Sequence, residues 1–121
     1  GQYVELDKDT LAVGSTGEDS NQTTITNDNS TASSNNDSSS SGAVYVYKRT
    51  GTTWAQEAYI KASNNGEGDS FGSTIALVDN ETLAVGASGE DSDQSTITNG
   101  ISTSSNNNSS NSGAVYVYSF K

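Results

Sequence analysis

Two long stretches of this sequence are nearly the same. Residues 83–92 read Leu-Ala-Val-Gly-Ala-Ser-Gly-Glu-Asp-Ser, and residues 11–20, which lie 72 positions earlier, differ from them at only two places. The run Ser-Gly-Ala-Val-Tyr-Val-Tyr occurs at residues 41–47 and again, 71 positions later, at residues 112–118. A unit of this length made of short strands cannot bury its own apolar faces, and such units gain stability by stacking on copies of themselves. The sequence therefore predicts one unit written nearly twice.

Apolar residues are few and unevenly spread. Val, Ile, Leu and Phe make up 19 of the 121 residues, and the formal net charge is −10, values that for an even distribution would indicate disorder. Two polar inserts, residues 20–41 and 92–112, contain only three of those 19 residues. The rest of the chain holds the other sixteen, all six Tyr and the single Trp, so it can build a β-rich core.

The charge and the missing residue types exclude several functions. Fifteen acidic residues against five basic ones disfavour nucleic acid and anionic membranes, which require clustered Lys and Arg, and favour cations as partners. His and Cys are absent, which excludes nucleophilic catalysis of the Ser-His or Cys-His kind and thiolate metal sites. The longest apolar run, residues 43–47, is too short to be inserted across a bilayer.

Alternation of apolar and polar residues predicts β-strands, and no stretch has helical periodicity. Val4 and Leu6, for example, alternate with acidic residues as in a half-buried strand. The small residues Ala12 and Gly14 share one face of the next strand, which predicts that another sheet packs closely against it. Seven strands are expected, at residues 1–7, 10–15, 42–47, 54–62, 71–79, 81–88 and 113–118.

The aromatic residues have two possible roles. The tyrosines at 45 and 47, repeated at 116 and 118, could form a sugar-stacking ladder, but aromatic residues at period two usually pack between sheets. Trp54, which is expected to share a face with Ala58 and Ile60, and Phe71 are predicted as core anchors.

The inserts consist almost entirely of Ser, Asn, Thr and Asp, a composition typical of flexible loops. Residues 24–27 nevertheless recur as residues 96–99, so part of the insert belongs to the repeated unit. For such an insert to have a fixed path, we expect it to be held by an ion, a glycan or neighbouring protein. The insert asparagines in glycosylation sequons are Asn21, Asn29, Asn36, Asn107 and Asn108.

Phe71-Gly72, followed by Val85-Gly86-Ala87-Ser88, is similar to the FG-GAP repeat of integrin α-chains and of many secreted bacterial proteins, with Ser88 in the place of Pro. The likeness is greater to the bacterial branch, in which phrases such as residues 42–47, 59–63 and 68–72 follow in this order. The resemblance covers essentially the whole chain. It implies that each unit is a four-stranded blade of a β-propeller. The expected fold class is therefore all-β, with two incomplete blades and a repeat period of about 71–72 residues.

The repeat also sets the expected domain boundaries. Residues 1–63 form the first blade-like repeat, and residues 64–121 form the second, which is truncated after its third strand. The calcium loop of the family is missing, because residues 7–9 and 79–81 are only tight hairpins. A ring needs about four to eight blades, so further copies or blades are expected as partners. The next subunit could supply the missing fourth strand, giving a ring or a filament.

Acidic residues after both Leu-Ala-Val-Gly stretches are the candidate binding groups. Carboxylate pairs such as Glu18 with Asp19 could serve a glycosidase, but neighbours on one strand usually point apart. The favoured hypothesis is calcium, which takes about six to eight oxygen ligands. The alternative is that these are solvated turn residues that keep the protein soluble. The candidate calcium ligands are Glu18, Asp19, Asn21 and Asp28 in the first copy and Glu90, Asp91 and Asp93 in the second.

These features predict a non-enzymatic extracellular module, secreted or at the cell surface, with a structural or adhesive role. It would form a homo-oligomer or join further repeats, and its inserts would present a surface for a protein or glycan ligand. One alternative is a calcium-dependent ligand-binding FG-GAP domain of a larger receptor-like surface protein. A second alternative is an accessory domain of a secreted hydrolase whose catalytic part lies elsewhere.

Overall fold

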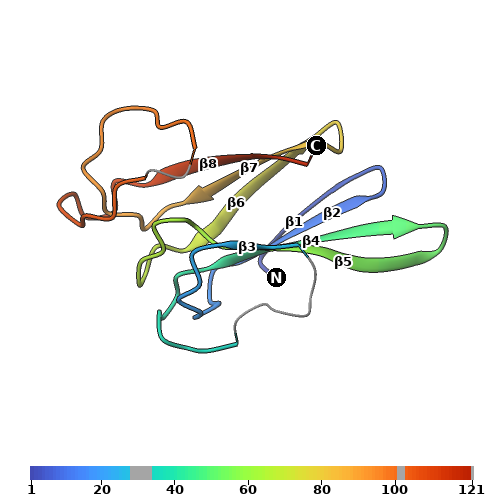
Figure 1. Cartoon of the computed structure of the whole chain (residues 1–121), viewed down its shortest axis with the longest axis horizontal. Helices are drawn as coiled ribbons and strands as arrows, with labels where there is room; N and C mark the ends of the chain where they lie inside the picture. Colours follow the sequence, from blue (N-terminus) through green and yellow to red (C-terminus); the bar gives the residue numbers. More distant parts are fainter. Residues whose placement is uncertain (28–33, 101–102, 121) are drawn as a thin grey trace.

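The computed structural model describes residues 1–27, 34–100 and 103–120, and all regular structure in this part of the chain is β-strand (Figure 1). The all-β prediction is confirmed, and each of the seven expected strands is present with slightly different ends. An additional strand of two residues lies in the first insert. The strands are Tyr3–Asp7 (β1), Thr10–Ser15 (β2), Ile25–Thr26 (β3), Ala43–Thr50 (β4), Thr53–Ile60 (β5), Phe71–Val78 (β6), Thr82–Ala87 (β7) and Ala114–Ser119 (β8).

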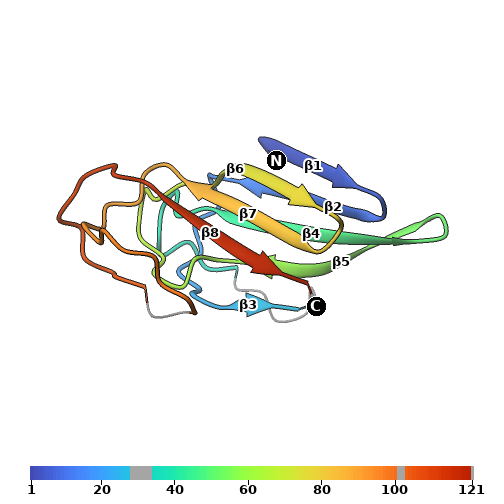
Figure 2. The ribbon, with the colours of Figure 1, turned by 90° about the horizontal axis from the view of Figure 1, so that it is seen from above.

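The strands form two antiparallel sheets, one from each copy of the repeat. The first sheet has the order β1-β2-β4-β5-β3, and the second has the order β6-β7-β8. The sheets lie one above the other as two layers, and β6 lies against β1 and β2 (Figures 1 and 2). Most of the described parts of the inserts lie at the end of the molecule away from the β1–β2 and β6–β7 turns, whereas β3 of the first insert lies along β5. The layers are consistent with two blade-like propeller fragments.

The hydrophobic core lies between the layers. The first sheet contributes Val44 and Val46, whose side chains are fully buried. The second sheet contributes Leu83 and Val85 of β7 and the two tyrosines of β8. Phe71 is completely buried in the same core, as expected. Because burial of each large apolar side chain contributes about 1.5–3 kcal/mol, this contact between unlike faces is the main stabilising feature of the fold.

The two copies bury opposite faces: the side chains that one sheet buries in the core correspond to side chains that the other sheet exposes. Val117 of β8 is the counterpart of Val46, yet 69% of its surface is exposed compared with 1% for Val46. Conversely, Leu6 on the outer face of the first sheet is 61% exposed, whereas its counterpart Leu77 is only 9% exposed. The apolar residues of β1 therefore lie on the open side of its sheet. The two-layer stack is open at both ends, and its end faces are unlike.

The copies keep the same side-chain pattern although their lengths differ. Leu6 pairs with Leu11, and Leu77 pairs with Leu83 in the same way. The first residues of these two pairs are 71 positions apart and the second residues are 72 positions apart. The additional residue lies in the hairpin turn, which has two residues between β1 and β2 and three between β6 and β7. Both predicted tight hairpins are confirmed.

The layers come closest where β2 passes β6. A Cβ atom on Gly14 would lie 2.3 Å from the carbonyl oxygen of Gly72, so the two backbones are in direct contact. Gly72 itself has a φ of 92°, a conformation that L side chains rarely adopt. Ala12 on the same face of β2 is fully buried. The close approach expected from the small residues of this strand is confirmed.

Trp54 is not a core anchor, and that expectation is wrong. The register between β4 and β5 shifts by one residue, which leaves Glu57 without a partner on β4. Because this bulge reverses the alternation of side chains, Trp54 points away from the face that carries Ala58 and Ile60. The Trp54 side chain is 42% exposed, and the guanidinium of Arg49 lies 5.7 Å from the centre of its ring.

We predict that Gly14→Ala lowers the free energy of unfolding by about 1–3 kcal/mol, because the new methyl group would push the two backbones apart. Gly17→Ala is the matched control, since a Cβ there would meet no atom within 4 Å, and it should change stability by less than about 0.5 kcal/mol. Urea unfolding followed by circular dichroism measures both. Equal stability of the two variants would contradict the close approach.

Candidate functional site

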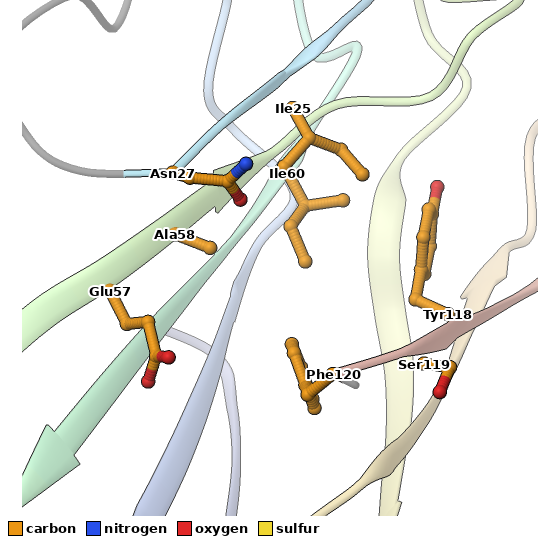
Figure 3. A pocket seen from close by; sticks show the side chains of 8 residues that line it. All are labelled: Ile25, Asn27, Glu57, Ala58, Ile60, Tyr118, Ser119 and Phe120. Atoms are coloured by element: carbon orange, nitrogen blue, oxygen red, sulfur yellow. The ribbon is translucent and has the colours of Figure 1, made fainter.

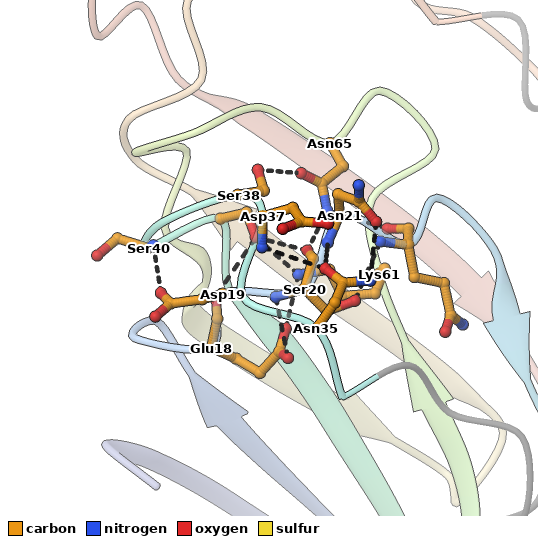
Figure 4. Close-up of polar contacts among 12 residues, drawn as sticks. Glu18, Asp19, Ser20, Asn21, Asn35, Asp37, Ser38, Ser40, Lys61 and Asn65 are labelled. Carbon is orange, nitrogen blue, oxygen red and sulfur yellow. Dashed lines mark hydrogen bonds and ion pairs between the residues drawn. The ribbon is translucent and has the colours of Figure 1, made fainter.

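Acidic side chains that accept hydrogen bonds from the backbone form a framework under each insert. In the first copy, Asp19 Oδ1 accepts the Ser40 N–H at 2.7 Å, and the Asp19 carbonyl accepts the Ser38 N–H at 2.7 Å (Figure 4). Glu18 Oε1 accepts the Ser20 N–H at 3.1 Å. These bonds tie the end of the insert back to its start.

The same framework recurs in the second copy. Asp91 Oδ1 accepts the Asn111 N–H at 2.5 Å, and the Asp91 carbonyl accepts the Ser109 N–H at 2.7 Å. Glu90 Oε2 accepts the Ser92 N–H at 3.2 Å. Hydrogen bonds of the chain itself therefore hold the described parts of both inserts, and binding of an ion, a glycan or neighbouring protein there stays a prediction.

A buried ion pair anchors the first insert to the sheet, and its lysine was not among the predicted site residues. Lys61 directly follows β5, and its side chain is completely buried. Its Nζ lies 2.7 Å from Glu18 Oε2 and donates to Ser41 Oγ at 2.7 Å. Burial lowers the pKa of the Lys61 ammonium, and the hydrogen bond to Glu18 opposes that shift. The available signal is a lysine that ends an apolar strand in a chain with only five basic residues.

Two adjacent asparagines join the copies. Asn65 Nδ2 donates to two carbonyl groups of the first insert, both at 2.9 Å, and one of these belongs to Ser20. Asn64 Nδ2 donates to Glu90 Oε1 at 3.0 Å, and Asn64 Oδ1 accepts the Tyr116 hydroxyl at 2.5 Å. Each asparagine thus serves a different insert, and the junction fixes the inserts relative to each other.

The remaining candidate calcium ligands have partners within the inserts. The Asn21 Oδ1 atom accepts from Asn35 Nδ2 at 3.1 Å, and Asp93 Oδ2 accepts from Asn108 Nδ2 at 3.1 Å. Asp28 lies outside the described residues. In the part of the chain that the structure describes, no three acidic side chains form a group that could hold a metal ion. Calcium binding at these residues stays a prediction.

Two carboxyl groups are buried at the junction between the copies. Asp69 is 4% exposed and Glu90 is 5% exposed. Burial raises the pKa of Asp69 to about 6, the nearby carboxylates of Glu90 and Asp91 add to this shift, and a hydrogen bond from the Gly66 backbone opposes it. Burial also raises the pKa of Glu90. The junction therefore concentrates negative charge in a place with little water.

A groove of about 830 Å³ runs beside β8. Val115 and Val117 of β8 line one side, and residues 96–100 of the second insert line the other, including Ile97, which is 91% exposed. Glu90 lines the same groove. Lys61 also lines it, so the groove combines exposed apolar side chains with a buried carboxylate and a buried ammonium.

A smaller pocket of about 430 Å³ lies between β5 and the end of β8 (Figure 3). It is lined mainly by Ile25, Ala58 and Ile60 of the first sheet and by Tyr118 and Phe120 of the second. The side chains in Figure 3 face one another across the gap between the layers. The two layers are thus less tightly filled at this edge than in the core.

The tyrosines of the repeated strands pack against other rings. The rings of Tyr116 and Tyr118 meet Phe71 edge-on, with centroids 5.2 and 6.3 Å away. The ring of Tyr45 lies 5.2 Å from that of Tyr59. These contacts favour the packing role over a sugar-stacking ladder.

The candidate glycosylation sites that the structure describes are exposed in the inserts, and they are Asn21, Asn36, Asn107 and Asn108. Asn29 lies outside the described residues. Exposure makes these asparagines accessible to modification, and their use stays a prediction.

The fold and the framework define a stacked β-repeat module of the propeller type. The family model of the FG-GAP repeat matches residues 54–118, which is more than half of the chain, and the chain belongs to this family. FG-GAP repeats are non-catalytic β-propeller repeats that typically occur in extracellular or surface proteins. Comparisons with curated proteins and with solved structures gave no match. Among the described residues, no helix is present that could cross a membrane.

We predict that Lys61→Met lowers the free energy of unfolding by about 3 kcal/mol, because it leaves the Glu18 carboxylate without its cation in a partly buried place. The double variant Lys61→Met/Glu18→Gln should recover part of this loss. Lys48→Met, which removes a positive charge from the surface, is the control. Urea unfolding measures all three. A single Lys61 variant as stable as the parent chain would disprove the anchoring role.

The raised pKa of the buried Asp69 carboxyl predicts that the protein is more stable in mild acid than at neutral pH. Its pKa is raised on folding, to about 6, so its stabilising contribution is present below the pKa of an unfolded aspartate and is lost as the pH rises through about 6. We predict that Asp69→Asn gains about 3 kcal/mol at pH 7 relative to the parent chain and that the difference vanishes near pH 4. Thermal unfolding between pH 4 and 7 measures this difference. Glu67→Gln, at an exposed turn position, should show no such trend.

Proposed function

We propose that this chain is a non-enzymatic structural module of an extracellular or surface protein, and that it assembles by adding further repeat units to the two open faces of its stack. The observation that supports this most directly is the unlike character of these faces. The exposed face of the second sheet, which carries Val115 and Val117, corresponds to the face that the first sheet buries in the core through Val44 and Val46. The outer face of the first sheet is a counterpart of the face that the second sheet buries.

The exposed residues make the two faces complementary. Val115 and Val117 on one face are 72% and 69% exposed, and Val4 and Leu6 on the other are 58% and 61% exposed. Such apolar surface is typical of contact sites. The contact between the two sheets of one chain, repeated between chains, would bury both faces. Because each chain would use a different face toward each neighbour, the assembly is head-to-tail and gives a ring or a filament.

The polar groups support a role in structure and not in catalysis. The best-buried carboxylates accept hydrogen bonds from backbone or asparagine donors, and one of the predicted carboxylate pairs, Glu18 with Asp19, is divided between Lys61 and the Ser40 backbone. The two inserts, with exposed asparagines, would form the outer surface of the assembly. An adhesive role would be carried by this surface.

Head-to-tail assembly makes a sharp prediction for variants that block one face each. We expect the chain to form large species in light scattering, with Leu6→Lys and Val117→Lys each giving monomers of 12.5 kDa. Mixing the two variants should give a dimer, because each variant keeps the face that the other has lost. Ser39→Lys, which adds the same charge at an exposed insert position, should leave the large species intact.

The outcomes separate the alternatives. A monomeric parent chain would disprove assembly and favour a domain that needs the rest of a larger receptor-like protein or a secreted hydrolase. If the large species dissociate when calcium is chelated, assembly depends on bound calcium. If the two blocked variants remain monomers on mixing, the association is not head-to-tail.

A further inference from the structure

We propose that the second insert holds a site of spontaneous chemical modification, at which the side-chain amide of Asn99 is converted to a carboxylate through attack by the backbone nitrogen of Gly100. The inference goes beyond the proposed function, because it concerns the covalent chemistry of the insert and not its contacts. Asparagine is a thermolabile residue in proteins. Whether a given asparagine reacts depends on the residue that follows it and on the hydrogen bonds that hold both residues.

The reaction needs only groups of the chain and water. The backbone nitrogen of Gly100 loses its proton and bonds to Cγ of Asn99, the Cγ–Nδ2 bond breaks, and the side-chain nitrogen leaves as ammonia. Water then opens the cyclic imide at one of its two carbonyl groups, which gives aspartate or isoaspartate. No oxidant or reductant takes part. A side chain on the attacking residue hinders the first step, so glycine, which has none, is the most favourable residue in that place.

Asn99 and Gly100 are free to take part in this reaction. Both are exposed, and both lie outside the strands. Neither has a hydrogen bond to another described residue. A Cβ atom on Gly100 would meet no described atom within 4 Å, so the surroundings leave room for the attack. No bond to the described part of the chain has to break before the two residues react.

The sequence has a second Asn-Gly pair, Asn65 with Gly66, and there the reacting groups are held. Asn65 Nδ2 donates to two backbone carbonyls, both at 2.9 Å, and Asn65 Oδ1 accepts the Ser38 hydroxyl at 2.8 Å (Figure 4). The backbone N–H of Gly66 donates to the carboxylate of Asp69. Attack at Asn65 requires these bonds to break. The fold therefore protects one Asn-Gly pair and leaves the other open.

The first insert lacks the site at the equivalent position. Residues 24–27 recur as residues 96–99, so Asn27 is the counterpart of Asn99, and it is exposed as well. The residue after Asn27 is Asp28, whereas the residue after Asn99 is Gly100. An aspartate in that place carries a side chain that hinders the attack. Each conversion at Asn99 therefore adds a negative charge to the second insert alone, and the two copies become less alike as the protein ages.

Mass spectrometry of the full chain, incubated at neutral pH below its unfolding temperature, tests the proposal. Cleavage after glutamate separates the three asparagines, because Asn27 lies in fragment 19–57, Asn65 in fragment 58–67 and Asn99 in fragment 91–121. We expect the Asn99 amide to become an acid about tenfold or more faster than the other two, since Asn65 must first break hydrogen bonds and Asn27 is followed by a side chain. If Asn99 converts no faster than Asn27 or Asn65, the proposal is overturned.

Urea and one variant separate the two causes. In urea the hydrogen bonds of Asn65 are lost, so Asn65 should convert as fast as Asn99 while Asn27 stays slow. Gly100→Asp gives the second insert the Asn-Asp sequence of the first and should slow Asn99 about tenfold, both folded and in urea. Ser95→Asp, which adds the same charge at an exposed position of that insert, should leave the rate unchanged.

Each contrary result removes a defined part of the proposal. If Gly100→Asp converts as fast as the parent chain, the Gly100 backbone is not the attacking group. If Asn65 stays slow in urea, its hydrogen bonds are not what protects it. Because every readout is a change of mass at a known residue, none of them depends on whether the chain assembles.

Discussion

The packing of one sheet on the other through unlike faces is the contact on which the rest of the structure depends. A face of small residues and valines meets a face of leucines and tyrosines, and Gly14 and Gly72 let the backbones touch. Because each sheet can bury only one of its faces against the other, apolar side chains remain exposed on both outer faces. The same contact gives the stability of the module and its two unlike ends.

The polar part of the chain depends on the apolar part in a specific way. The inserts contribute little to the core, yet the carboxylates of Asp19 and Asp91, directly before them, accept backbone N–H groups from the described end of each insert. Burying Lys61 has a cost in desolvation, which its pairing with Glu18 offsets. The arrangement fixes the position of β5 relative to the insert, because the lysine cannot move without leaving a carboxylate unpaired.

The sequence predicted most of the strands, the hairpins and the stacking, because repetition and alternation are local patterns. It did not predict the exposure of Trp54, because a bulge at Glu57 reverses the alternation of side chains and no residue type at that position indicates a bulge. Nor did it predict the pair of Lys61 and Glu18, which lie far apart in the chain and meet only through the sheet. The hydrogen-bond framework of the inserts was not predicted either. Their hydrogen bonds join side chains to distant backbone atoms and have no periodicity that could be read in advance.

The turn between β6 and β7 has one residue more than the turn between β1 and β2. The second insert is one residue shorter than the first, so β8 is again 71 positions after its counterpart β4. A single residue added inside a strand would exchange its two faces and destroy the core, whereas in a turn or an insert it leaves every face unchanged. Insertions and deletions are thus tolerated only in segments that are not hydrogen-bonded into a sheet. For repeats that diverge after duplication, the places where copies differ in length mark the segments that are free to change, and in this chain those segments are the ones turned toward the surroundings.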